Sequence, residues 1–392
     1  MRGTTNVIAY VGSYTTAAVL NAHGVGISVY RIDARTGRWQ LIQVLAADDG
    51  DPATPPPSAD PLPVNPSYLA LDHTQTRLYT VHGDATQLSS FAIDERSGEL
   101  TRLNTVDTGR QNPVYITVDP TNRWVVVANL DPPGSIITLR RQRDGSLGPI
   151  AGDITLPGTP GPHKIEQLGC QPHQARFDPT GRWLAVPDRG LDRIFVLRLD
   201  TANGALSLND PGWVPTRELA GPRHIAFNPT APFAYAIDEL RSTITTYRWD
   251  NKRGTLEALQ VLPSTPPDMT GDSRAAEIVV APSGRHVYAS NRSGAGVIDP
   301  QHPKDTIGVW TVDPGTGLLE PVTWTSTDGY VPRFFTIDAA SERLYAANQV
   351  SDSIVAFAID ARAGRLRPTG PPVDVRSPAC IILRETAPHP AA

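Results

Sequence analysis

Six ionisable residues in the middle and later parts of the chain have side chains suited to acid–base chemistry on an anion. They are His173, Arg189, Arg223, Glu239, Arg292 and Arg333. A carboxylate and an imidazole can accept or donate a proton in a reaction at neutral pH. Guanidinium groups bind carboxylates and phosphates through paired N–H donors. These residue types together predict proton transfer on a small, negatively charged molecule, with Glu239 and His173 as the groups that move the proton.

The elements that carry these residues belong to a repeat. A glycine closes a short turn seven times, at Gly37, Gly98, Gly145, Gly204, Gly254, Gly317 and Gly364. A strand-like run precedes each turn, such as DRIFVLRLD at 192–200, and two further strand patterns precede that run. With a weaker strand after the turn, each unit contains four short strands, which is the blade of a β-propeller.

The two ends of the chain complement each other within this repeat. The N-terminal part begins with a second-strand pattern (IAYVGSY, 8–14), whereas the C-terminal part ends with a lone first-strand pattern (SPACIIL, 377–383). Pairing them completes a seventh blade and leaves no open sheet edge. We therefore expect an all-β fold, a seven-bladed propeller with four-stranded blades that forms a single domain over residues 1–392. A Pro-rich loop at 49–64 and an insertion at 293–305 interrupt the repeat.

The repeat predicts which residues face one mouth of the central channel. The first strand of a blade lines the channel, and its start lies beside the end of the antiparallel second strand. The first-strand starts are Ser67, Val114, His173, Arg223, Ala276, Arg333 and Ala379, and the second-strand ends are Tyr14, Gly83, Leu130, Arg189, Glu239, Arg292 and Gln349. Ionisable groups gather in the third to sixth units, so we expect a site on one side of the mouth. Structural roles stay open, since Glu239 could simply pair with Arg223 and His173 could be a hydrogen-bonded rim residue.

Composition and motifs argue against several other classes of protein. The net charge of −5 at pH 7 and the pI near 6.0 give no basic surface for a nucleic-acid partner. No run of about 18 apolar residues could span a membrane, and no signal peptide is evident, so we expect a cytoplasmic protein. Two cysteines, Cys170 and Cys380, do not make a disulfide framework. No residue spacing is diagnostic of a metal site, and nucleophile-elbow, zinc-protease and P-loop motifs are absent.

Several long segments resemble a known family. They are YVGSYT at 10–15, QPHQARFDPTGRWLAVPDRG from 171, GPRHIAFN with a later Glu-Leu pair from 221, AAEIVVAPSGRHVYASNR at 275–292 and PRFFTIDAASERLYAANQ from 332. The chain is similar to the lactonase-type seven-bladed propellers, which include propeller-type 6-phosphogluconolactonases and fungal carboxy-cis,cis-muconate cyclases. The resemblance implies that His173, Arg223, Glu239 and Arg292 are catalytic, and these are residues that the two columns also single out.

Three functions are compatible with these observations. The first is hydrolysis of an anionic sugar-acid lactone, with Glu239 as general base, Arg223 and Arg292 as an anion clamp and His173 at the leaving oxygen. The second is a cycloisomerase of the muconate cyclase type, and the third is a non-enzymatic binding scaffold. We expect substrate contacts from Gln174, Arg189, His224, Glu277, Arg333, Gln349 and, through the 157–170 loop, Lys164. No cofactor or metal is expected, and we expect a monomer or a weak homodimer.

Overall fold

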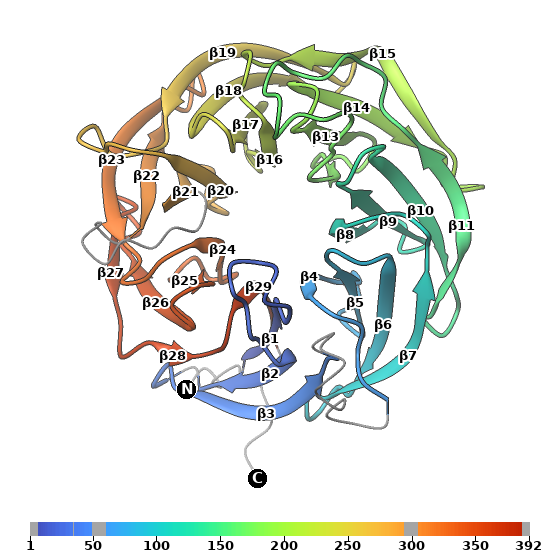
Figure 1. The fold of residues 1–392 in the computed structure, drawn as a ribbon. Helices are drawn as coiled ribbons and strands as arrows, with labels where there is room; N and C mark the ends of the chain where they lie inside the picture. Colours follow the sequence, from blue (N-terminus) through green and yellow to red (C-terminus); the bar gives the residue numbers. More distant parts are fainter. Residues whose placement is uncertain (1–6, 34, 49–59, 294–304, 386–392) are drawn as a thin grey trace.

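The computed structural model describes residues 7–33, 35–48, 60–293 and 305–385. Within these ranges the chain forms 29 strands in seven sheets and contains no helix. The sheets stand as blades around a central channel (Figure 1). The predicted all-β, seven-bladed architecture is therefore confirmed. The described part of the chain accordingly offers no long apolar helix of the kind that crosses a membrane.

The strands of a blade follow one another from the channel outward. From inside to outside, the closing blade contains β29 (Pro378–Glu385), β1 (Val7–Ser13), β2 (Gly26–Ile32) and β3 (Trp39–Ala46). Blade 1 contains β4 (Pro66–Leu71), β5 (Arg77–His82), β6 (Gln87–Ile93) and β7 (Leu100–Asp107), and blade 2 contains β8 (Pro113–Val118), β9 (Trp124–Asn129), β10 (Ser135–Arg141) and β11 (Leu147–Ile154). Blade 3 contains β12 (Arg176–Phe177), β13 (Leu184–Asp188), β14 (Arg193–Leu199) and β15 (Leu206–Pro215).

The remaining blades have the same order of strands. Blade 4 contains β16 (Pro222–Phe227), β17 (Phe233–Asp238), β18 (Thr243–Asp250) and β19 (Thr255–Pro263). Blade 5 contains β20 (Ser273–Val280), β21 (His286–Ser293), β22 (Thr306–Val312) and β23 (Leu319–Ser326). Blade 6 contains β24 (Pro332–Ile337), β25 (Arg343–Asn348) and β26 (Ser353–Ile359), whose outer neighbour is divided into β27 (Leu366–Pro368) and β28 (Val373–Asp374).

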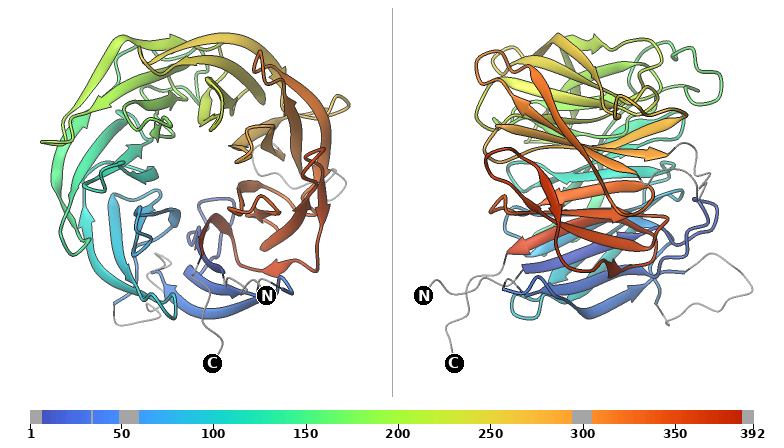
Figure 2. Two further views of the ribbon diagram at one scale, coloured as in Figure 1. Left: turned by 180° about the vertical axis from the view of Figure 1, so that it is seen from behind. Right: turned by 90° about the vertical axis from the view of Figure 1, so that its left-hand side faces the viewer.

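The first and last strands close the ring, as the sequence predicts. Strand β29 pairs with β1 in antiparallel register from Val7 opposite Glu385 to Gly12 opposite Cys380. Strand β29 thereby supplies the innermost strand that the N-terminal part of the closing blade lacks. The start of β1 and the end of β29 lie on the same face of the ring (Figure 2). Closure removes the sheet edges that an open array of blades would expose.

The repeated glycines are required by backbone conformation. All seven turn glycines adopt positive φ, from 67° at Gly254 to 95° at Gly145. This left-handed region is costly for residues that carry a Cβ atom, and glycine enters it freely. The repeated Gly turn therefore has a structural cause, namely the tight connection between the third and fourth strands of each blade.

Aromatic side chains in or just before the second strands fasten most blades to the Gly turn of the next. The hydroxyl groups of Tyr10, Tyr79, Tyr235 and Tyr288 donate to the carbonyl oxygens of Gly98, Gly145, Gly317 and Gly364, over 2.9–3.1 Å. Trp124 and Trp183 donate from their indole N–H to the same turns in the following blades, at Thr201 O and Asn251 O. Among the described residues, six of the seven joints between blades thus contain such a side-chain hydrogen bond to the next Gly turn, which we call a clasp.

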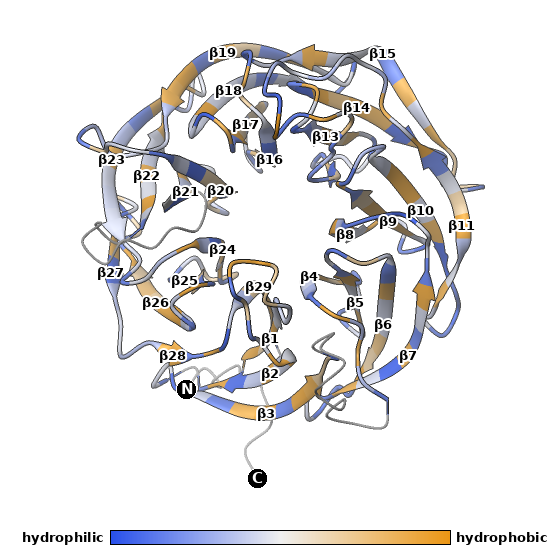
Figure 3. Ribbon diagram, in the orientation of Figure 1, coloured by the Kyte–Doolittle hydropathy of each residue, from blue (hydrophilic) through white to orange (hydrophobic). Residues whose placement is uncertain are grey.

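The core lies between the blades. Side chains of the second and third strands are almost all buried, as in β9 and β17, whereas outermost strands such as β3 and β19 are partly exposed. Apolar residues follow the strands and polar residues follow the turns (Figure 3). Strand β12 is shorter than the predicted first strand of its unit, because only Arg176 and Phe177 pair with β13 and the preceding segment makes a single bridge at Pro172.

Candidate active site

The two predicted columns of residues meet at one mouth of the channel. In six blades the residue after the second strand donates its backbone N–H to the residue before the first strand. The six bonds are Tyr14 to Ser377, Gly83 to Asn65, Leu130 to Asn112, Arg189 to Gln171, Glu239 to Gly221 and Gln349 to Val331. In blade 5 the register instead places Arg292 opposite Arg274. The strand pairing therefore brings the charged members of the two columns to a common rim.

Aromatic rings close the channel beneath this rim. The ring centroids of Tyr68 and Tyr115 are 4.6 Å apart, and Phe334 lies 5.8 Å from Tyr68. The His224 ring completes this layer at 6.0 Å from Tyr115. Above it is a cavity of about 10 Å³, room for about one water molecule, whose lining includes His173. We call this cavity and the charged rim around it the cup, and the aromatic layer its floor.

Glu239 is the centre of the charged cluster. Its Oε2 lies 3.3 Å from Arg223 Nε and 3.5 Å from Arg189 Nε, and its Oε1 lies 3.2 Å from Arg292 Nη2. Burial by itself would raise the pKa of this carboxyl, but the three guanidinium groups hold the pKa well below its usual value. Its side chain retains 13% exposure, so an ionised carboxylate is accessible from the cup.

Arg223 connects this cluster to a buried pair beneath it. Its Nη1 donates to Ala276 O at 2.7 Å and lies 3.3 Å from His224 Nε2. His224 Nδ1 lies 2.9 Å from Glu277 Oε1, so Nδ1 carries the proton and Nε2 accepts from Arg223. Burial, and then the repulsion of Arg292, lower the pKa of Arg223 to about 9, which leaves it charged at neutral pH. The Glu277–His224 pair thus fixes the orientation of Arg223 from below.

His173 stands beside this arrangement as a neutral imidazole. It is 4% exposed, and its ring centroid lies 5.3 Å from that of His224. Burial, followed by the charge of Arg223, lowers the pKa of His173 well below its usual value. Its Nδ1 is buried and makes no hydrogen bond within the described structure. A buried polar atom without a partner is uncommon, and at a cup of this kind it points to a ligand or a water.

The opposite side of the rim carries further unsatisfied groups. Arg333 Nη2 donates to the Tyr14 hydroxyl at 2.8 Å and its guanidinium lies 4.8 Å from the centre of that ring. Among the described residues no carboxylate lies within ion-pair distance of Arg333. Gln349 is 1% exposed, and both polar atoms of its amide are buried without a partner in the described structure. Within the described residues, Gln349 therefore has both amide atoms free for a ligand, and Arg333 has a guanidinium group with no carboxylate partner.

Charge in the cup is unevenly balanced. Five guanidinium groups line or overlook it, those of Arg189, Arg223, Arg274, Arg292 and Arg333. Four carboxylates lie close to them, those of Glu166, Glu239, Glu277 and, at 3.4 Å from Arg274 Nε, the exposed Asp272. With both histidines neutral, the guanidinium groups outnumber these carboxylates by one. Such an excess in a partly buried site favours the binding of an anion.

Known proteins share this architecture over the whole ring. A family model described as "Lactonase, 7-bladed beta-propeller" matches residues 8–383. The chain belongs to this lactonase family. It is 30% identical to a 6-phosphogluconolactonase of Bacillus subtilis, over 96% of this chain and 98% of the relative. A 6-phosphogluconolactonase of Formosa agariphila is 29% identical, over 91% of this chain and 94% of that relative. A solved periplasmic gluconolactonase of Pseudomonas aeruginosa superposes with a TM-score of 0.81 at 27% identity, covering 98% and 100% of the two chains.

The structure of this lactonase-family chain adds two residues, Glu166 and Arg274, that the sequence did not single out. Glu166, on the 157–170 loop, pairs with Arg189 and lies 3.2 Å from Arg274 Nη1. Lys164, the predicted ligand contact on that loop, is exposed and makes no ion pair within the described residues. The sequence did contain an indication of a further carboxylate, because the two columns combine four arginines with a single acidic residue, Glu239.

Other predicted substrate contacts are already engaged within the fold. Gln174 is buried, and its Oε1 accepts the backbone N–H of Ile225 at 2.7 Å across the joint between blades 3 and 4. His224 and Glu277 bind each other below Arg223. The predicted Pro-rich loop and insertion fall largely on 49–59 and 294–304, which lie outside the described residues. Within the described part, no group of three or more His, Cys, Asp or Glu side chains is placed to hold a metal.

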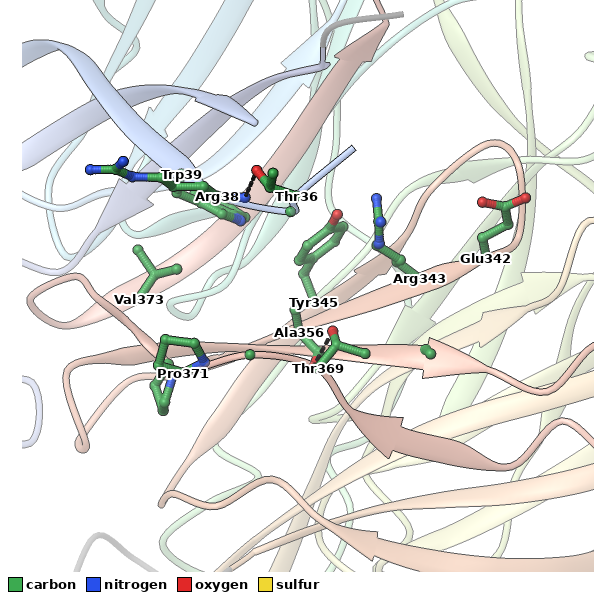
Figure 4. Close-up of a pocket in the computed structure, with 14 residues that line it drawn as sticks. Thr36, Arg38, Trp39, Glu342, Arg343, Tyr345, Ala356, Thr369, Pro371 and Val373 are labelled. Atoms are coloured by element: carbon green, nitrogen blue, oxygen red, sulfur yellow. Dashed lines mark hydrogen bonds between the residues drawn. The ribbon is translucent and has the colours of Figure 1, made fainter. Parts of the chain in front are cut away.

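A larger cavity lies elsewhere in the lactonase fold, at the joint between blade 6 and the closing blade. It measures about 640 Å³ and is lined by residues such as Trp39, Tyr345 and Thr369 (Figure 4). Here Tyr345 takes the place of the clasp tyrosines, but the opposite turn is so open that a Cβ atom at Gly37 would meet no neighbour within 4 Å. The cavity thus reflects a loosely packed joint, and it contains none of the buried ionisable groups that make the channel mouth suitable for chemistry.

Proposed function

We propose that this chain hydrolyses lactones that carry an anionic group, such as the lactone of a phosphorylated sugar acid. The observation that carries the proposal is the ionised carboxylate of Glu239 inside a cup in which guanidinium groups outnumber carboxylates. A neutral substrate would leave that positive excess uncompensated, whereas a phosphate or carboxylate would balance it. The names of the relatives, 6-phosphogluconolactonase and gluconolactonase, support the same reaction class.

The reaction requires attack of water on the lactone carbonyl and departure of the ring oxygen. Glu239 would orient the water and accept its proton, which is general base catalysis. Arg223 and Arg292 would stabilise the oxyanion that develops on the carbonyl oxygen, because both guanidinium groups already lie against the Glu239 carboxylate. His173, with its unpartnered Nδ1, would donate a hydrogen bond to the departing ring oxygen, and that oxygen would leave with the proton that Glu239 took from the water. Arg333 would contribute a further donor to the bound substrate.

Substrate binding would also adjust the basicity of Glu239. Three guanidinium groups lower its pKa in the ligand-free cup, and a carboxylate of low pKa is a weak base. An anion bound to the same arginines offsets their charge and raises the proton affinity of the carboxylate. The anionic group of the substrate would therefore contribute to kcat as well as to binding.

Steady-state hydrolysis of 6-phosphogluconolactone by the Glu239→Gln and Arg223→Ala variants tests the proposal. Loss of the base is expected to lower kcat/KM by about 10²–10⁴-fold, and loss of one oxyanion donor by about 10²–10³-fold. Arg241→Ala is the matched control, because Arg241 is exposed just after Glu239 and donates to Glu218 O instead of the cluster. Thermal unfolding of each variant verifies that it is folded.

Wild-type kcat/KM in both site variants would overturn the assignment. Offering a carboxy-cis,cis-muconate beside the lactone separates hydrolysis from cycloisomerisation, because ring formation needs a proton delivered to carbon and releases no acid from the sugar lactone. A folded wild-type protein that turns over neither substrate would favour a binding scaffold. Hydrolysis of the lactone alone is the result we expect.

A further inference from the structure

The 157–170 loop is held over the rim by fixed anchors. Gln167 is buried, and its Nε2 donates to Arg189 O at 3.0 Å while its Oε1 accepts the backbone N–H of His163 at 3.1 Å. Gly161 N–H donates to Gly190 O at 2.8 Å. The backbone N–H of Gln167 also closes a turn on His163 O, 3.0 Å away. These bonds keep the loop in place without any help from the Glu166 side chain.

Glu166 is placed by these anchors with its carboxylate on two guanidinium groups. One oxygen binds Arg189, and the other lies 3.2 Å from Arg274 Nη1. Among the described residues, Arg274 has one further acidic neighbour, the exposed Asp272, at 3.4 Å from its Nε. The Glu166 side chain is 29% exposed and that of Arg274 is 20% exposed, so solvent and solutes reach this contact. The ion pair is therefore of the exchangeable, rim-exposed kind and not part of the sealed core.

The guanidinium group of Arg189 contacts two carboxylates, those of Glu166 and Glu239. Its Nη1 donates to the backbone O of Glu166 at 2.9 Å, its Nη2 binds the Glu166 carboxylate, and its Nε lies 3.5 Å from Glu239 Oε2. The two carboxylates thus sit on different edges of one planar guanidinium group. A small lactone with its carbonyl at Glu239 would place a terminal anionic group at the edge that Glu166 now occupies.

We propose that Arg189 and Arg274 form a second anion-binding subsite, that Glu166 fills it in the ligand-free protein, and that the remote phosphate or carboxylate of the substrate displaces Glu166. This inference rests on the proposed function, since it names where the anionic end of the lactone binds. A phosphate brings more acceptor oxygens and more charge than the resident carboxylate, and two guanidinium groups can bind it through paired donors.

Glu166 then acts as a tethered competitor of the anionic group of the substrate. A competitor joined to the protein lowers the apparent affinity of every ligand that needs the subsite. A phosphorylated lactone must displace Glu166 before it contacts Arg189 and Arg274, whereas an uncharged lactone does not use the subsite and is unaffected by the competitor. The selectivity of the enzyme for phosphorylated over uncharged lactones would therefore depend on the balance between Glu166 and Arg274.

The test compares the ratio of kcat/KM for 6-phosphogluconolactone to that for the uncharged gluconolactone. Glu166→Gln is expected to raise this ratio by about 10-fold or more, and Arg274→Ala to lower it by a similar factor, as loss of one charged hydrogen bond implies. Glu218→Gln and Arg241→Ala make the same charge changes at exposed positions after strands β15 and β17, and they should leave the ratio at the wild-type value.

Titration of inorganic phosphate into the same proteins by calorimetry provides a readout that does not depend on turnover. Phosphate should bind more tightly to Glu166→Gln and more weakly to Arg274→Ala than to wild type. Weaker phosphate binding to Glu166→Gln, or equal binding and an equal selectivity ratio in all variants, would overturn the subsite. If the wild type hydrolyses neither lactone, the proposed function fails. The phosphate titration then still tests whether Glu166 competes with an anion for Arg189 and Arg274.

Discussion

Glu239 and Asp238 are neighbours in the chain, yet their pKa values shift in opposite directions. Glu239 faces three guanidinium groups, which hold its pKa well below the usual value despite burial. Asp238 is 1% exposed and accepts hydrogen bonds only from the hydroxyl groups of Thr243 and Thr245. Burial, incompletely offset by these hydroxyls, raises the pKa of Asp238 to about 7. Charged partners, and not depth alone, decide the ionisation of a carboxyl at this rim.

This contrast predicts a pH dependence of stability that belongs to Asp238. Its pKa is about 7 in the folded state against 3.8 when exposed, so between these values the folded protein binds more protons than the unfolded chain. The contribution of this group to the free energy of unfolding is therefore fully present below about pH 4. It is lost as the pH rises through 7, at roughly 1.4 kcal/mol per pKa unit. Asp238→Asn should remove that decline, measured as the free energy of unfolding in urea at pH 5 and pH 8.

Asp144→Asn serves as the control for the pH experiment. Asp144 is an exposed turn residue whose pKa is lowered by hydrogen bonds from Ser146, so it is ionised in both states over this range. The control should therefore keep the wild-type slope of stability against pH. An Asp238→Asn protein with that same slope would show that Asp238 does not titrate near neutrality.

Second strands and Gly turns are the elements that join one blade to the next. In blade 4 the hydroxyl of buried Tyr235 donates to Gly317 O of blade 5 at 3.1 Å. The corresponding residue of blade 6, Tyr345, faces the cavity at the closing joint and contacts Arg343 there instead of Gly37. A tyrosine at this position therefore stabilises the joint by a hydrogen bond only where the carbonyl group of the next turn is close enough to accept it.

Removal of single hydroxyl groups should reveal this difference. Tyr235→Phe leaves Gly317 O buried without its donor and is expected to cost about 1–3 kcal/mol in the free energy of unfolding. Tyr345→Phe keeps the ring against Trp39, 5.5 Å away, and its hydroxyl donates to none of the described carbonyl groups of the Gly37 turn, so a smaller loss is expected. Chemical denaturation of both variants checks the prediction, and equal losses would contradict the idea that the clasp stabilises the joint.

At the scale of the whole molecule, the ring depends on a strand from the far end of the sequence. Strand β29 lines the channel and carries Cys380 and Ile381, both fully buried, against β1. Without it the closing blade would expose the edge of β1 and apolar side chains of blades 1 and 6.

Truncation tests this dependence directly. Ending the chain after Ser377 deletes β29, and we expect the protein to lose its cooperative thermal transition or to aggregate, as seen by calorimetry and size-exclusion chromatography. Ending it after Glu385 retains every described strand and should preserve the wild-type midpoint. A soluble monomer with an unchanged midpoint after deletion of β29 would refute the role assigned to closure.

Repeat spacing and local backbone preference determined much of the architecture. Gly254 and its six counterparts predicted the tight turns, and the incomplete patterns at the two ends predicted that β29 pairs with β1. The columns through Arg223 and Glu239 were also predictable, because strand alternation and antiparallel pairing place such residues by counting alone.

Only the tertiary structure decided which of these charged residues contact one another and which further side chains enter the site. Glu166 enters the site from a loop whose path depends on the bonds of Gln167 to blade 3, and no periodicity describes such a path. The aromatic floor at Tyr68 and Tyr115 arises from side chains on different blades that meet across the channel. Sequence determines periodic elements because their geometry is local, whereas the balance of charge in the cup depends on distances between side chains that are far apart in the chain.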